Sequence, residues 1–276
     1  MAENKKGLIE KLKKTANELR KDILRMTTEA GSGHPTTSFS AIDIMACLYF
    51  HEMKFDPKKP DWPERDRFLM SKGHGVPAQY ACLAHAGYFP KTELNSLRQI
   101  NSRLQGHPDR VKTPGIEVSS GSLGQGLSVG NGMALAARLD KKNYRVYVML
   151  GDGEMQEGQI WEAAMSAANF KLDNVCAILD KNGIQNDEWV EKEKTIEPLS
   201  DKWKSFGWRV IEIDGHNFGQ ILKALAKARA VKGKPTIIIA KTVKGKGVSF
   251  IENRPDMHGV AVKKEDMEQA LKELGE

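Results

Sequence analysis

Cysteine is scarce in this sequence, and its scarcity excludes two classes of protein. Only three cysteines occur among 276 residues, and Cys47, Cys82 and Cys176 each stand alone in an apolar segment. Structural zinc sites need Cys or His at short, paired spacings, and disulfide scaffolds are rich in cysteine. We therefore interpret these residues as small buried side chains in a reducing compartment, which favours a cytoplasmic protein.

Long apolar runs are also missing. No segment approaches the roughly 18 apolar residues that a membrane helix needs, and no signal peptide opens the chain. The net charge is +6, but the basic residues are spread out apart from "NKKGLIEKLKK" near the N-terminus. That cluster is interpreted as the solvated face of a helix, so neither a membrane nor a nucleic acid is expected as a partner.

The sequence does contain a regular alternation of apolar strands and amphipathic helices. After residue 125, the predicted strands "YRVYVML", "VCAILD", "WRVIEID" and "PTIIIAKT" alternate with helical segments. Such alternation is typical of a mostly parallel sheet that helices cover on both faces. Without repeats or a linker, it predicts one α/β domain over 1–276.

The first part of the chain is less regular. Apolar spacing predicts a helix over 7–29 and a second helix in "AIDIMACLYFHEM", capped by Ser38 or Ser40. A short strand "RFLMS" and a helix from about Val76 follow, and then a Gly-, Pro- and Ser-rich loop over 101–125. Loops of that length in a compact domain are usually functional.

One strand ends on a carboxylate between two glycines, at Gly151-Asp152-Gly153. Ligands of open α/β sheets bind beyond the carboxyl ends of strands, and a carboxylate tolerates phosphate there when a cation such as Mg²⁺ lies between them. If the next strand is its neighbour, Asn182 in "ILDKNGIQ" stands beside Asp152, and the Ile184 carbonyl adds a third oxygen. Gly-Asp-Gly alone is a common turn, but the paired Asn favours a metal–diphosphate site. No dinucleotide G-x-G-x-x-G follows a strand, and no Walker loop is present.

These residues resemble the thiamine diphosphate motif, Gly-Asp-Gly followed about thirty residues later by Asn. Further segments resemble the transketolase family, in the family's order: "GSGHP", "SKGHG", "QGHPD", "SSGSLGQGLSVGNGMALA" and "DMHGV". The resemblance runs from about residue 15 to the end and covers the diphosphate-binding domain, the first of three in a full-length transketolase. It implies a three-layer thiamine diphosphate-binding fold with a central, mostly parallel sheet.

The resemblance also implies roles for individual residues. Asp152, Asn182 and the Ile184 carbonyl would bind Mg²⁺, for which Ca²⁺ or Mn²⁺ could substitute, and Gly153 would bind the diphosphate. The remaining implied cofactor contacts are His74, Gly121, Ser122, Leu123 and His258. His34, His107 and His258 would line the substrate channel, and Glu157 would lie at a dimer contact within a proton relay. Ser122 replaces a common proline, and "NGIQNDEWV" lacks the family's usual Asp-Gly, which leaves the loop after Ile184 less defined.

The histidines support the same interpretation without the family. His34, His74, His107 and His258 lie in Gly-rich loops, where imidazoles can bind sugar hydroxyls and transfer protons. His51, His85 and His216 have no such setting and are interpreted as structural. The segment "TVKGKG" could attract phosphate, but a mobile solvated loop explains it at least as well.

The expected function is that of a transketolase N-terminal subunit in the pentose phosphate pathway, moving a two-carbon ketol group from a ketose phosphate to an aldose phosphate. The alternatives are the alpha subunit of a 2-oxoacid dehydrogenase, a 1-deoxyxylulose-phosphate synthase-like enzyme, and a non-catalytic thiamine diphosphate-binding protein. The pyrimidine-binding and C-terminal domains, with the glutamate that activates the cofactor, are expected on a partner chain. We expect an α₂β₂-type heterotetramer and self-association of this chain without its partner.

Overall fold

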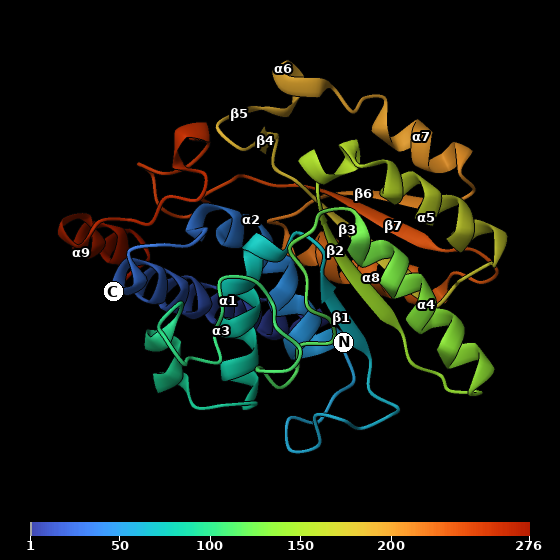
Figure 1. Ribbon diagram of the computed structural model, residues 1–276, viewed down its shortest axis with the longest axis horizontal. Coiled ribbons are helices and arrows are strands. Elements are labelled where there is room, and N and C mark those ends of the chain that lie inside the picture. Colours follow the sequence, from blue (N-terminus) through green and yellow to red (C-terminus); the bar gives the residue numbers. More distant parts are fainter. Residues whose placement is uncertain (1) are drawn as a thin grey trace.

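A five-stranded parallel sheet forms the centre of the structure, a computed structural model that describes residues 2–276, with side chains from residue 5 onward (Figure 1). Its strand order is β1-β2-β3-β7-β6, and every neighbouring pair is parallel. The predicted parallel sheet is therefore confirmed. The strands are β1 (Arg67–Met70), β2 (Val146–Gly151), β3 (Val175–Lys181), β6 (Arg209–Asp214) and β7 (Thr236–Lys241).

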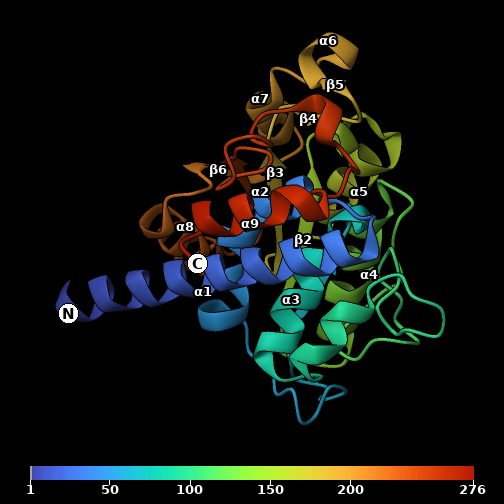
Figure 2. The same ribbon diagram turned by 90° about the vertical axis from the view of Figure 1, so that its left-hand side faces the viewer.

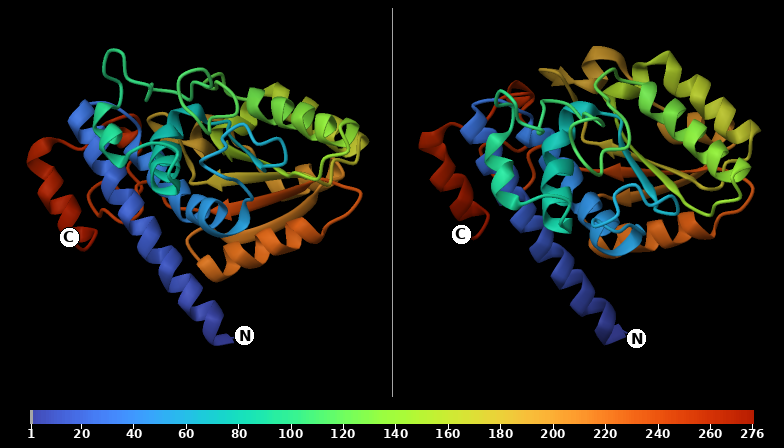
Figure 3. Two further views of the ribbon diagram at one scale, coloured as in Figure 1. Left: turned by 90° about the horizontal axis from the view of Figure 1, so that it is seen from below. Right: turned by 60° about the horizontal axis from the view of Figure 1, so that its bottom comes forward.

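Helices cover both faces of this sheet, as the alternating pattern predicts (Figures 1 and 3). One layer contains α1 (Ala2–Ala30), α2 (Pro35–Cys47), α3 (Val76–Ala86) and α8 (Phe218–Ala230). The opposite layer contains α4 (Gln125–Leu139), α5 (Gly158–Asn169) and α7 (Leu199–Ser205). The last helix, α9 (Lys264–Glu273), lies along α1, whose N-terminal end projects away from the remaining elements (Figure 2).

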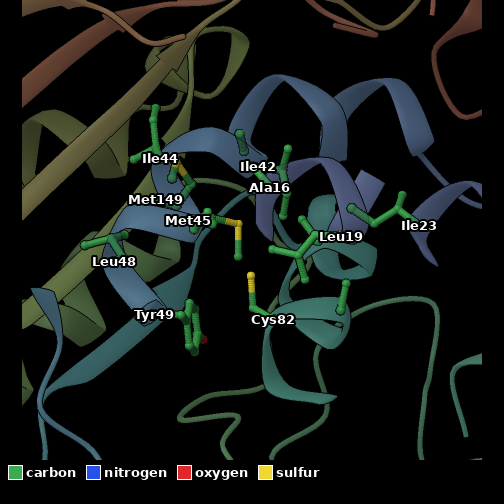
Figure 4. Packing of buried hydrophobic residues seen from close by; sticks show 14 of the residues in the cluster. Ala16, Leu19, Ile23, Ile42, Ile44, Met45, Leu48, Tyr49, Cys82 and Met149 are labelled. Carbon is green, nitrogen blue, oxygen red and sulfur yellow. The ribbon is translucent and has the colours of Figure 1, made fainter. Parts of the chain in front are cut away.

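Alternate side chains of the strands pack into two separate hydrophobic cores. In β2, Tyr147 and Met149 point into the core below α1, α2 and α3, whereas Val148 and Leu150 point into the core below α4 and α5. This alternation fixes which face each strand residue occupies, because the side chains of a strand point to opposite faces in turn. Figure 4 shows the first core, where Leu19, Met45 and Cys82 meet. All three cysteines are buried and free, as predicted.

Two predicted details are wrong or incomplete. The second helix begins at Pro35 and not after Ser38 or Ser40, because proline at the first helical position needs no N–H donor and has its φ already set. The segment after β3, predicted as a loop, contains a small antiparallel hairpin of two-residue strands, β4 (Ile184–Gln185) and β5 (Glu188–Trp189). The helix α6 (Val190–Lys194) follows it. Shorter turns of π or 3₁₀ type lie at Leu48–Glu52, Gly73–Gly75, Lys91–Ser96, Gly153–Gln156 and Pro255–Met257.

The predicted long loop is present. Between Ser96 and Gln125 the chain forms turns and bends without a helix or strand. It passes over the ends of β1 and β2, where the Ser120 hydroxyl donates to the carbonyl of Met70 at 2.7 Å. Among residues 2–276, no helix has the length and apolar composition that crossing a membrane requires.

Two glycines of α4 provide a test of this packing. A Cβ on Gly126 would lie 2.4 Å from Ser71 Oγ, whereas a Cβ on Gly132 would meet nothing within 4 Å. We expect Gly132→Ala to stabilise the chain by about 0.5–1 kcal/mol through helix propensity. Gly126→Ala should destabilise it by about 1–3 kcal/mol through overpacking. Chemical denaturation of both variants measures the two signs, and a stabilising Gly126→Ala would contradict this packing of α4 on the β1 loop.

Candidate active site

A cavity of about 470 Å³ opens where four neighbouring strands end. The segments after β1, β2, β3 and β7 all contribute to its wall, together with the start of α2 and the long loop. This is the place where open α/β sheets bind their ligands. The polar and charged residues that line it are His34, Thr37, Lys72, His74, His107, Asp152, Glu154, Gln156, Glu157, Asn182, Gln185, Asn186, Lys244 and His258, with Leu123, Gly151, Gly153 and Ile184 between them.

Asp152 stands at the end of β2 as a buried carboxylate, only 2% exposed. Its Oδ1 accepts from the Gly153 N–H at 2.9 Å, and its Oδ2 accepts from the Gly183 N–H at 2.5 Å. Burial raises the pKa of Asp152 to about 6, an effect that the Gly183 hydrogen bond opposes and the nearby Asp180 reinforces. The carboxylate therefore lies in a place that favours a bound cation.

The neighbouring strand brings the second predicted oxygen to this point. Gly151 of β2 is in register with Asp180 of β3, so the residues that follow both strands meet at one edge. Asn182 is buried, and its Oδ1 accepts from the Ile184 N–H at 3.1 Å. Asp152 thus contacts the segment that carries Asn182 and Ile184, as the sequence predicts if the strands are neighbours.

Three of the predicted histidines form a triangle in the cavity. The ring centroids of His34, His74 and His258 lie 5.0, 5.2 and 5.3 Å apart. Burial and the cationic side chains nearby lower the pKa of His34 to about 4 and that of His258 to about 3, and they hold the pKa of His74 well below its usual value. The three rings are therefore neutral at pH 7. His107 lies on the same wall, and its pKa is lowered mainly by partial burial.

Two buried lysines give the cavity its charge. Lys72 forms an ion pair with Asp180, which also accepts from Ser40 Oγ at 2.5 Å. Lys244 is 1% exposed, and among the described residues it forms no ion pair. Its Nζ lies 2.6 Å from His258 Nδ1 and 3.5 Å from the Ile184 carbonyl. Burial and the charge of Lys72 lower the pKa of Lys244 to about 8.

A buried glutamate joins the loops around this cavity. Glu154 is 2% exposed and accepts hydrogen bonds from the Gly124 N–H at 2.8 Å, the Gly151 N–H at 3.0 Å and the Ser71 hydroxyl. It thereby ties the start of α4 to the ends of β1 and β2. Of the predicted contacts just before α4, Leu123 lines the cavity, whereas Gly121 and Ser122 lie outside its wall.

Comparison with known proteins places this geometry in a family. Residues 11–276 match the family "Transketolase, thiamine diphosphate binding domain". The chain belongs to the transketolase family. It is 45% identical to a 6-deoxy-6-sulfo-D-fructose transketolase subunit of Clostridium sp. (strain MSTE9), over 95% of this chain and 96% of that protein.

Other transketolases agree with this assignment. One of the subunits of an apulose-4-phosphate transketolase from Actinobacillus succinogenes is 41% identical, and the match covers 96% of both chains. Human transketolase is 43% identical, but the match covers 96% of this chain and only 42% of the human protein. A solved transketolase structure from Leishmania mexicana superposes with a TM-score of 0.91 at 36% identity, over 96% of this chain and 41% of that one. The fold is thus the transketolase diphosphate-binding fold.

The cavity of this transketolase domain fits a metal-bound diphosphate. Among its described side chains, Thr37 Oγ1 and His34 Nδ1 are buried without a hydrogen-bond partner, and so is Gln185 Oε1. Buried polar groups are rarely left in that state, so a ligand with donors and acceptors is expected. Lys244 offers an unpaired positive charge to a phosphate, and Asp152 offers a carboxylate to a metal. In the described chain, no group of three or more His, Cys, Asp or Glu is arranged for a metal, so a metal held by Asp152 would take its further ligands from amide and carbonyl oxygens.

Several lining residues have no counterpart in the sequence prediction. Lys72 and Thr37 carry no local pattern that distinguishes them from surface residues, and Gln156 and Gln185 pair with each other at 2.9 Å across two loops. Lys244 lies in "TVKGKG", for which the sequence predicts a solvated loop at least as strongly as phosphate attraction. The burial of Lys244 excludes the solvated alternative for that side chain.

The lowered pKa of His34 predicts an acid-sensitive chain. Between pH 6.5, the ordinary pKa, and about 4, the unfolded chain binds a proton on His34 that the folded chain does not bind. The free energy of unfolding of the cofactor-free chain should therefore fall as the pH drops through this window, and should gain nothing from His34 above it. His34→Gln should lose less stability than the wild type between pH 7.5 and 5.5 in chemical denaturation. Equal losses would contradict a neutral, buried His34.

Proposed function

We propose that this chain is the cofactor-binding subunit of a split transketolase, which transfers a two-carbon ketol group from a ketose phosphate to an aldose phosphate. One observation carries the proposal: Asp152 and Asn182 flank a cavity that also holds the neutral histidine triangle and the unpaired Lys244. Two relatives that match this chain along nearly their whole length are named as subunits of transketolases.

The oxygen donors at the ends of β2 and β3 are the proposed metal ligands. Asp152, Asn182 and the carbonyl of Ile184 supply a carboxylate, an amide and a backbone oxygen, a set that suits Mg²⁺, Ca²⁺ or Mn²⁺. The metal would lie between Asp152 and the diphosphate and offset their repulsion. Gly153 would let the backbone approach the diphosphate, and Lys244 would face it with its unpaired charge.

Thiamine diphosphate supplies the carbanion chemistry for carbon–carbon bond cleavage beside a carbonyl when it is bound. The chain would hold the cofactor through His74, Leu123 and the backbone of Gly121 and Ser122, with His258 near the diphosphate. The sugar would be oriented by His34, His107 and His258, whose neutral rings can each donate and accept a hydrogen bond. Because Lys244 donates to Nδ1 of His258, the proton of that ring is on Nε2.

The activating glutamate and the remaining domains are proposed to lie on a partner chain. This chain covers 42% of the full-length transketolases that it matches. The proposed complement is therefore a chain that carries the pyrimidine-binding and C-terminal domains, in a heterotetramer. Glu157 is exposed at the cavity wall, where a second subunit could reach it. A cytoplasmic location stays a prediction.

The competing functions have less support. The alpha subunit of a 2-oxoacid dehydrogenase shares the metal motif, as does a 1-deoxyxylulose-phosphate synthase-like enzyme, but the family match and the named relatives are transketolases. A purely binding protein would not need four histidines in one cavity. The relatives act on sulfosugar or apulose phosphate by name, so the sugar pair of this chain is open among phosphorylated and sulfonated sugars, and the pathway with it.

Removal of the proposed metal ligands tests the metal–diphosphate site. Thiamine diphosphate should bind only with a divalent ion, because the phosphates and Asp152 repel each other without one. Asp152→Ala and Asn182→Ala should each reduce cofactor-dependent activity of the complete enzyme by at least about 100-fold while the circular dichroism spectrum stays unchanged. Glu157→Gln is a control on the same wall that should retain metal dependence. Full activity of Asp152→Ala in the presence of a chelator would exclude the assignment.

Reconstitution tests the split enzyme. The purified chain is supplied with thiamine diphosphate, Mg²⁺, a ketose phosphate and an aldose phosphate, and the candidate partner is added afterwards. We expect no ketol transfer before the partner is present, because the glutamate that activates the cofactor is proposed to lie on the partner's pyrimidine-binding domain. Substantial transfer by this chain alone would refute the split-enzyme proposal.

A further inference from the structure

The loop after β7 determines where Lys244 stands. Lys244 is buried and has no carboxylate partner among the described residues, so no ion pair fixes its ammonium group. The ammonium contacts two neutral groups, Nδ1 of His258 at 2.6 Å and the Ile184 carbonyl at 3.5 Å, and the backbone of residues 242–246 sets where the side chain starts. That backbone turns sharply at Gly245, where φ is +77° and a Cβ would lie 2.4 Å from the Ile251 carbonyl. Whatever holds this loop therefore helps to place Lys244.

His216 contacts this loop from outside the cavity. It follows β6, and its Nε2 accepts from the backbone N–H of Val243, next to Lys244, at 2.8 Å. Its Nδ1 lies 2.8 Å from Oδ2 of Asp43, a residue of α2 that is 4% exposed. Because Nε2 must be an acceptor, the proton of the neutral ring is on Nδ1 and is donated to Asp43. The carboxylate thus fixes the tautomer that can hold Val243.

The same carboxylate anchors a second contact with the loop. Arg20 of α1 donates from Nη2 to Asp43 Oδ2 at 2.8 Å and from Nε to the carbonyl of Lys246 at 3.0 Å. Although burial disfavours its charge, Arg20 and His216 hold the pKa of Asp43 below its usual value. Asp43 therefore stays ionised and positions two donors at once. The loop is bound at Val243 on one side of Lys244 and at Lys246 on the other.

Close backbone packing supports the contact from His216. The N–H of Gly215 donates to the carbonyl of Lys241 at 2.7 Å. A Cβ on Gly215 would lie 2.4 Å from Thr242 Cγ2, so only glycine allows this approach. The close contact of Gly215 with the end of β7 thus brings His216 next to the loop that follows.

We propose that His216, oriented by Asp43, is a positioning residue that places Lys244 against the diphosphate of the bound cofactor. This inference rests on the proposed function, in which Lys244 faces that diphosphate. His216 does not line the cavity, so its effect passes through the backbone of Val243. Loss of the hydrogen bond would remove one of the contacts that fix the backbone beside Lys244, while the bonds from Asn253 N–H to the Lys244 carbonyl and from Gly245 N–H to the Thr36 carbonyl remain. The ammonium would then be less well placed, and small displacements weaken a directed charge contact.

The chain contains a matched control for this pair. His85 of α3 lies 2.6 Å from Asp22 of α1 and has a side-chain exposure of 11%, close to the 14% of His216. No hydrogen bond of His85 reaches the loop after β7. His85→Ala therefore removes a similar histidine–aspartate pair without touching Lys244, and it reports the general effect of such a loss on stability.

Hydrogen exchange tests the hydrogen bond from the Val243 N–H to His216 without any ligand. In His216→Ala, the Val243 amide should exchange at least about tenfold faster than in the wild type, because its buried acceptor is gone. His216→Gln, whose side-chain carbonyl can accept the same N–H, should restore part of the protection. His85→Ala should leave Val243 unchanged. If His216→Ala exchanges at the wild-type rate, His216 does not hold the loop and the proposal is overturned.

Cofactor binding tests the consequence. With Mg²⁺ present, His216→Ala should raise the dissociation constant for thiamine diphosphate of the complex with its partner by about tenfold. His85→Ala should not raise it, even at an equal loss of melting temperature, and His216→Gln should lie between wild type and His216→Ala. Equal constants for His216→Ala and His85→Ala would overturn the positioning role. A wild-type complex that does not bind thiamine diphosphate would instead refute the proposed function. Hydrogen exchange at Val243 would still decide whether His216 holds the loop.

Discussion

The parallel register of β2, β3 and β7 is the constraint on which the rest of this site depends. Gly151 pairs with Asp180, and Asp180 pairs with Ala240, so the three strands end almost level. The segments that leave them carry a carboxylate, an amide and a lysine into the same space. The register is in turn fixed by burial, since Ile178 and Leu179 enter different cores and a slip by one residue would exchange them. Packing far from the cavity thus sets its geometry.

Charge within the cavity is balanced only in part. Asp180 neutralises Lys72 in a buried ion pair, and among the described side chains neither Asp152 nor Lys244 has such a partner. The pKa of Asp152 is raised to about 6 and that of Lys244 is lowered to about 8, so burial pushes both groups toward their neutral forms. A cation beside the first and an anion beside the second would reverse both shifts. A metal diphosphate, the proposed ligand, would bring these two charges together in one occupant.

Much of this architecture could be predicted from the sequence because it repeats with a short period. The apolar strands and helices after residue 125 are periodic, and the rule that ligands bind at the ends of parallel strands then joins Asp152 to Asn182. The β4–β5 hairpin could not be predicted in the same way, since strands of two residues contain no period. The start of α2 at Pro35 was hidden by a motif that looks like a chain breaker. Residues that act through distant neighbours gave no local signal either: His216 looked structural because Asp43 is 173 residues away along the chain.

The identities to known relatives do not single out one sugar. Two relatives named for different sugars, a sulfofructose and apulose 4-phosphate, are 45% and 41% identical to this chain, nearly the same distance. Whole-chain identities this similar assign neither sugar to this chain. In the proposed function, the cavity combines groups suited to a metal and a diphosphate with histidines that would meet hydroxyl groups common to ketoses. Selection at the far, phosphorylated or sulfonated end of the sugar would then fall to residues of the proposed partner.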